Sequence, residues 1–115
     1  MKNKILITGV AGFIGFSVAK NLLKKKYKVL GVDNLNNYYN QRLKKERIKK
    51  LRSKNFEFIK LDLKNKNQIN KSLKNKKINL VLHFAAQPGV RYSISHPMSY
   101  IDSNLVGFQK ICFSI

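Results

Sequence analysis

The sequence predicts an α/β fold built on an open, doubly wound parallel sheet. Short apolar runs rich in β-branched residues occur at residues 4–8, 28–32, 56–61 and 79–84, and segments with helical spacing of apolar residues lie between them at about 13–26, 39–54 and 66–76. Strands that alternate with helices indicate parallel pairing through right-handed crossovers. The strand runs are almost continuously apolar, as expected where helices cover both faces. We therefore expect four strands in the order 3-2-1-4.

The first apolar run ends in three glycines spaced three residues apart, Gly9, Gly12 and Gly15, and a helical pattern follows at once. A strand that turns tightly into a helix leaves unpaired backbone N–H groups at the positive end of the helix dipole, which suits a diphosphate. We expect Gly9 to permit the turn, Gly12 to let the pyrophosphate approach the backbone, and Gly15 to let the helix lie close to the strand.

The second apolar run leads to Asp33, eighteen residues after Gly15. This is near the spacing of about 20 residues at which an acid accepts hydrogen bonds from the ribose hydroxyls of an adenosine. A carboxylate there repels a 2′-phosphate, so the pattern favours NAD over NADP. The alternative is a glycine-rich turn without a ligand, followed by an Asp that caps the next loop.

Two further strand ends carry candidate residues. The third strand ends before Asp62, which is placed either to read an adenine amino group or to cap the following helix. The fourth strand ends in His83, Phe84, Ala85, Ala86 and Gln87, across the sheet's switch point from the glycine turn, where ligands bind in such folds. Small residues there would let a cofactor lie against the backbone, although they also suit a strand end packed under a helix. We interpret His83 as a packed core residue rather than a base.

Composition and charge restrict the number of domains and the other classes of function. A chain of 115 residues that is 43% hydrophobic makes about one domain, and the single cysteine, Cys112, cannot form an intrachain disulfide. Its 24 basic and 5 acidic residues give a net charge of +19, which would suit a nucleic-acid-binding protein. No nucleic-acid motif or zinc spacing accompanies that charge, so a solvated lysine surface is the favoured interpretation. We predict no signal peptide, no membrane span, no metal site and a cytoplasmic location.

Three segments carry a family resemblance: TGVAGFIG at 8–15, GVDNLNNYY at 31–39 and HFAAQPGVRYS at 83–93. In this order they resemble the extended short-chain dehydrogenase/reductase family of NAD-dependent epimerases and dehydratases, and most closely its UDP-glucuronate 4-epimerases. Residues 97–108 are similar to the family's fourth helix. The resemblance implies a Rossmann-like domain in which bound NAD takes a hydride from C4 of a UDP-sugar and returns it to the opposite face.

The resemblance also implies roles for individual positions. Asp33 and Asn34 would contact the adenosine ribose, and Asp62 and Leu63 the adenine. Arg91 and Ser93 would begin the substrate cleft. The remaining implied cofactor contacts are Gly9, Gly12, Phe13, Ile14 and Gly15 at the pyrophosphate, Phe84, Ala85, Ala86 and Gln87 near the nicotinamide, and Asn104.

The chain departs from the family in its catalytic machinery. The family's general base is a Tyr four residues before a Lys, and none of the five tyrosines here has a Lys at that spacing. We expect residues 1–115 to form an incomplete NAD-binding domain that stops before the fifth strand and has no substrate-binding domain. The expected function is the NAD-binding part of such an epimerase, inactive alone, which would meet a UDP-sugar only if the missing half were supplied. A stand-alone or split-enzyme dinucleotide-binding module is the alternative.

Overall fold

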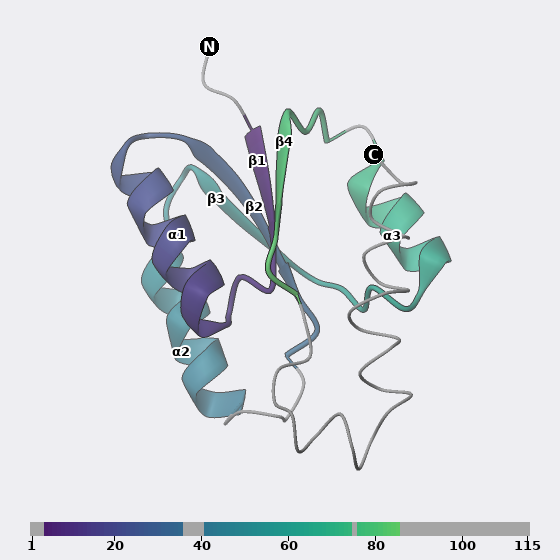
Figure 1. Cartoon of the computed structure of the whole chain (residues 1–115), viewed down its shortest axis with the longest axis horizontal. Coiled ribbons are helices and arrows are strands. Elements are labelled where there is room, and N and C mark those ends of the chain that lie inside the picture. The colour runs from purple at the N-terminus through teal and green to yellow at the C-terminus, as the bar shows by residue number, and fades with distance from the viewer. Residues whose placement is uncertain (1–3, 36–40, 75, 86–115) are drawn as a thin grey trace.

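A four-stranded parallel sheet forms the centre of the protein. The computed structural model describes residues 4–35, 41–74 and 76–85. Within them, β1 (Lys4–Thr8), β2 (Lys28–Asp33), β3 (Phe56–Lys60) and β4 (Leu80–His83) lie in the order β3-β2-β1-β4, with all pairings parallel (Figure 1). The doubly wound sheet and its strand order, predicted from the sequence, are therefore confirmed.

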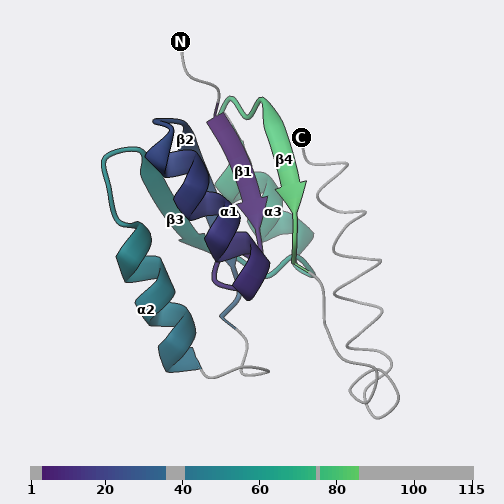
Figure 2. The same ribbon diagram turned by 60° about the vertical axis from the view of Figure 1, so that its left-hand side comes forward.

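Helices cover both faces of this sheet. Helices α1 (Phe13–Lys24) and α2 (Gln41–Leu51) lie on one face, and α3 (Lys66–Leu73) lies on the other, as Figure 2 shows. Side chains alternate along β1, so Ile5 and Ile7 pack towards Ala19 of α1, whereas Leu6 packs towards Ile69 of α3. Each face of the sheet therefore has its own apolar core.

The first helix ends two residues before its expected end. Lys24 is its last residue, and Lys26 takes a left-handed conformation with φ of 71°. The N–H of Tyr27 donates to the carbonyl of Leu22 at 3.1 Å, and the N–H of Lys26 donates to that of Leu23 at 3.0 Å. These two bonds form a Schellman motif, which here ends the helix with a lysine at the position that glycine usually occupies.

The other elements differ from the predicted ranges only at their ends. Helix α3 stops at Leu73 rather than near residue 76, because Lys74 is extended. Asn65 is the N-cap of α3, and its side chain accepts a hydrogen bond from the N–H of Gln68 at 3.0 Å. Asp62 therefore does not cap α3, which settles one of the two roles that the sequence left open for it.

Candidate functional site: a dinucleotide cradle at the ends of β1 and β2

The glycine turn joins β1 to α1 with little room to spare. Gly9 has φ of 69°, and a Cβ there would lie 2.7 Å from the carbonyl carbon of Phe84. A Cβ on Gly15 would overlap the carbonyl oxygen of Gly9. Gly12 is the N-cap of α1, and a Cβ on it would meet only Gly9 O, at 3.2 Å. The turn therefore requires glycine at Gly9 and Gly15, while Gly12 keeps the outer side of the turn open.

The start of α1 is suited to an anion. No side chain caps the helix, and its first turn contains no acidic residue. The N–H of Gly12 donates to Gly9 O at 3.0 Å, so the first-turn amides of α1 are the groups left to meet a ligand. Phe13 and Ile14, which contribute two of these amides, have exposed side chains. A helix start of this kind suits an anion, as the sequence predicts for a diphosphate.

Asp33 fixes the second part of the site relative to the first. It is the last residue of β2 and is 7% exposed. One carboxylate oxygen accepts from the N–H of Ala11 at 3.0 Å, and the other accepts from the N–H of Leu35 at 2.8 Å. The carboxylate thus ties the glycine turn directly to the end of β2, and Asn34 follows it in the chain. The acid predicted to meet the ribose lies beside the predicted diphosphate turn.

Helix α2 brings one cation to this carboxylate and a second one to the glycine turn. Lys44 is buried, and its ammonium lies 3.9 Å from Asp33 Oδ1, with both side chains less than a tenth exposed. Arg47 donates from Nη1 to the carbonyl of Ala11 at 2.9 Å, and its guanidinium lies 6.0 Å from the centroid of the Phe16 ring. These residues hold α2 against the turn and place positive charge beside the predicted ribose site.

The sequence interpretation missed both cations. It assigned the lysine-rich segment to solvent, which is wrong for Lys44. A signal was present, because Lys44, Arg47, Ile48 and Leu51 follow helical spacing and so share one face. Leu51 is buried, and Ile48 packs against the same core. A lysine within the inward stripe of a helix indicates a buried partner, which here is Asp33.

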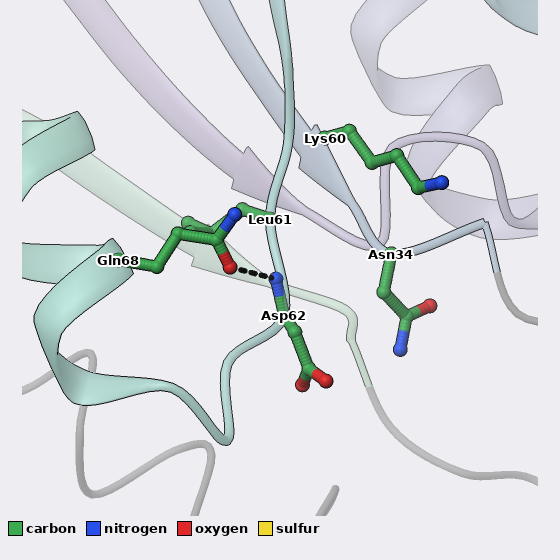
Figure 3. Close-up of a pocket in the computed structure, with 5 residues that line it drawn as sticks. All are labelled: Asn34, Lys60, Leu61, Asp62 and Gln68. Carbon is green, nitrogen blue, oxygen red and sulfur yellow. Dashed lines mark hydrogen bonds between the residues drawn. The ribbon is translucent and has the colours of Figure 1, made fainter.

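A pocket of about 290 Å³ lies beside Asn34, next to the predicted ribose site, and is drawn in Figure 3. The N–H of Asp62 donates to Gln68 Oε1 at 3.1 Å, and its carboxylate accepts from the N–H of Lys64 at 2.9 Å. Leu63 is buried in the core on the α3 face of the sheet, so only its backbone could reach a ligand. The pocket lies where the adenine was expected, and its lining consists of Asn34, Lys60, Leu61, Asp62 and Gln68.

Hydrogen bonds join the ends of β1 and β4. Thr8 Oγ1 lies 2.7 Å from His83 Nδ1 and accepts from the N–H of Ala85 at 3.1 Å. Since the hydroxyl accepts from Ala85, its own proton is available to His83. Burial lowers the pKa of His83 below its ordinary value, which favours the neutral ring. This places Phe84 and Ala85 beside the glycine turn, where the sequence predicted the nicotinamide side of the site.

Several predicted residues lie outside the described part of the chain: Ala86, Gln87, Arg91, Ser93 and Asn104. Among the residues that the structure does describe, no group of three or more His, Cys, Asp or Glu side chains is arranged to hold a metal ion. Over the same ranges, none of the helices combines the length and the apolar character that crossing a membrane requires.

Comparison with known proteins identifies the family. The family model described as GDP-mannose 4,6 dehydratase matches residues 6–113. The chain belongs to this family. Protein CapI of Staphylococcus aureus is 49% identical over 108 residues, which are 94% of this chain and 32% of that protein. UDP-glucuronate 4-epimerase of Thermodesulfobacterium geofontis is 46% identical over 103 residues, which are 89% of this chain and 32% of that protein.

A solved structure supports the same assignment. UDP-glucuronic acid 4-epimerase from Bacillus cereus, crystallised in complex with NAD, matches with a TM-score of 0.83 at 34% identity. The match covers 96% of this chain and 35% of that one. The resemblance to the epimerase and dehydratase family is therefore confirmed, as is the Rossmann-like fold. The chain spans about a third of the length of the relatives that it matches.

Proposed function

We propose that this chain binds the adenosine diphosphate half of NAD at the ends of β1 and β2, as the N-terminal cofactor-binding part of a UDP-glucuronate 4-epimerase-like enzyme. One observation supports this most directly: the carboxylate of Asp33 is hydrogen-bonded to the N–H of Ala11, inside the glycine turn. A ribose acid and an uncapped helix start are thereby held side by side, as a dinucleotide requires.

Each proposed contact follows from a position in the site. The first-turn amides at Phe13, Ile14 and Gly15 would donate to the diphosphate, and the openness at Gly12 would let it approach. Asp33 would accept from the ribose hydroxyls, with Asn34 beside it. Asp62 and the backbone of Leu63 would meet the adenine, and Phe84 and Ala85 would border the nicotinamide side. Ala86, Gln87, Asn104 and the substrate residues Arg91 and Ser93 remain predictions from the family resemblance.

Bound NAD would supply hydride transfer at C4 of the sugar. That step also needs a base for the 4-hydroxyl, and the sequence contains no Tyr-x-x-x-Lys pair to provide one. We therefore propose that the 115-residue chain binds cofactor without turnover, and that a UDP-sugar is processed only when the rest of the enzyme is supplied. A cytoplasmic location and the absence of nucleic-acid binding stay predictions.

Calorimetric titration of the chain with NAD tests the binding proposal, with Gly12→Asn as the variant. Asn is a good N-cap, so α1 is retained, but its side chain would occupy first-turn amides that the diphosphate needs. We expect NAD affinity to fall at least about tenfold, while the exposed control Lys20→Asn keeps the original affinity. Absence of NAD binding to the unmodified chain, or equal affinity in Gly12→Asn, would overturn the proposal.

The proposed lack of turnover is tested separately. The purified chain is incubated with NAD and UDP-glucuronate, and the products are separated by anion-exchange chromatography. We expect no UDP-galacturonate. Its formation at a rate proportional to the concentration of the chain would show that a base exists that the sequence pattern does not reveal.

A further inference from the structure

The ribose end of the site has a different charge from the one that a lone Asp33 implies. A carboxylate at this position normally discriminates against NADP, because it repels the 2′-phosphate. Here the carboxylate already accepts two backbone N–H groups and has the Lys44 ammonium 3.9 Å from Oδ1. Because both side chains are buried, solvent screens this pair only weakly. The net charge of the Asp33–Lys44 pair is therefore close to zero. A phosphate on the 2′-oxygen of the ribose would meet this near-neutral pair rather than a lone carboxylate.

Two more cations face the same region. Lys60, at the end of β3, is the register partner of Asp33, and paired residues of neighbouring parallel strands point to the same face of a sheet. In Figure 3 the Lys60 side chain extends towards the side of the pocket where Asn34 lies. Arg47 holds the carbonyl of Ala11, next to the N–H that Asp33 accepts. Around the ribose position, the three cations Lys44, Arg47 and Lys60 thus outnumber two carboxylates, those of Asp33 and of Asp62, which lines the same pocket as Lys60.

We propose that this site accepts a 2′-phosphorylated dinucleotide, NADP, with an affinity comparable to that for NAD. The inference rests on the proposed function, because it concerns the same cradle. Lys44 is the residue that sets the preference, since its ammonium cancels the charge of Asp33. Lys60 is exposed on the adjacent strand and supplies a cation for the added phosphate. The dinucleotide binds by its diphosphate and adenine in both cases, and the 2′-substituent changes only the local balance of charge.

The test measures the ratio of dissociation constants for NADP and NAD by calorimetry, with the full 115-residue chain at one fixed ionic strength. We expect the two constants to agree within about tenfold in the unmodified chain. Replacing Lys44 by Met removes the cancelling charge, so NADP should weaken relative to NAD by about tenfold or more. The matched control is Lys45→Met, which removes the same charge from the exposed neighbouring position and should leave the ratio unchanged.

A chain with a charge of +19 also attracts phosphates without a specific site. The isomer of NADP with the phosphate on the 3′-hydroxyl has the same charge. It should bind more weakly than NADP if the site recognises a phosphate at the 2′-position specifically. If Lys44→Met does not fold, as judged by circular dichroism, Lys60→Met carries the test and should weaken NADP more than NAD.

The outcomes are distinct. NAD binding with NADP more than about tenfold weaker in the unmodified chain overturns this inference alone. Equal changes of the ratio in Lys44→Met and Lys45→Met, or no change in either, would also overturn it, because Lys44 would then serve only to hold α2. Failure to bind either dinucleotide overturns the proposed function together with the inference.

Discussion

Replacing Asp33 by Ala should destabilise the fold severely, even though Asp33 was first identified as a ligand contact. Its carboxylate is the acceptor for the N–H groups of Ala11 and Leu35 and the partner of the buried Lys44 ammonium. Two N–H groups without an acceptor cost about 1–3 kcal/mol each, and a buried charge without its partner costs about 3–5 kcal/mol. The sum, about 5–11 kcal/mol, is comparable to the whole stability of an ordinary domain.

Urea unfolding followed by far-ultraviolet circular dichroism measures this loss. We expect Asp33→Ala to be largely unfolded without denaturant. The double variant Asp33→Ala with Lys44→Met should recover about 3 kcal/mol, because it also removes the buried ammonium that has lost Asp33. Adding Lys45→Met to Asp33→Ala instead should recover nothing, since Lys45 is exposed. A loss of less than about 1 kcal/mol in the free energy of unfolding of Asp33→Ala would refute the reasoning. Loss of NAD binding in this variant would not identify Asp33 as a ligand contact, because unfolding alone would cause it.

Three further predictions concern the elements around the site. Gly15→Ala places a Cβ against the carbonyl oxygen of Gly9 and should cost about 1–3 kcal/mol, measured by urea unfolding, with Ser17→Ala as an exposed control on the same helix. Lys26→Gly should raise stability by roughly 1 kcal/mol, because φ of 71° strains a lysine, and an unchanged melting temperature would contradict this. Because burial lowers the pKa of His83, the unfolded chain takes up the proton first as the pH falls below about 6.5, and stability should decline there. His83→Gln should flatten that decline in urea midpoints measured across this range.

Much of the fold could be predicted from the sequence because its signals are periodic and local. Apolar runs of strand length separated by helical spacing fix the order of elements, and the glycines mark the turn at β1. The helix ends were less predictable. Periodicity continues through Lys26, and only the backbone bonds from Tyr27 and Lys26 show where α1 stops. The cap of α3 likewise depends on which of two nearby side chains, Asp62 or Asn65, reaches the amide of Gln68.

The candidate site divides in the same way. The glycine turn and Asp33 could be predicted from the sequence, because a dinucleotide requires them at a set spacing along the chain. Lys44 was missed, because its burial depends on a partner in another element and its position on the helix is a weaker signal than the glycine spacing. Lysine usually marks a solvated face, and this chain has 24 basic residues to confuse the signal. Its place on the same helix face as Ile48 and Leu51 is a sequence signal, but the packing of α2 against the turn is what identifies Asp33 as its partner.

Two kinds of positive charge therefore act on a dinucleotide here, and salt separates them. The exposed lysines attract any phosphate over long distances, and a Debye length of about 8 Å at physiological ionic strength screens that attraction. Lys44 acts at 3.9 Å on Asp33 from a buried position, where screening is weak. Rising salt should then lower the affinities for NAD and NADP together. The part of their ratio that depends on Lys44 should persist, because it arises inside the site and not from the charge of the whole chain.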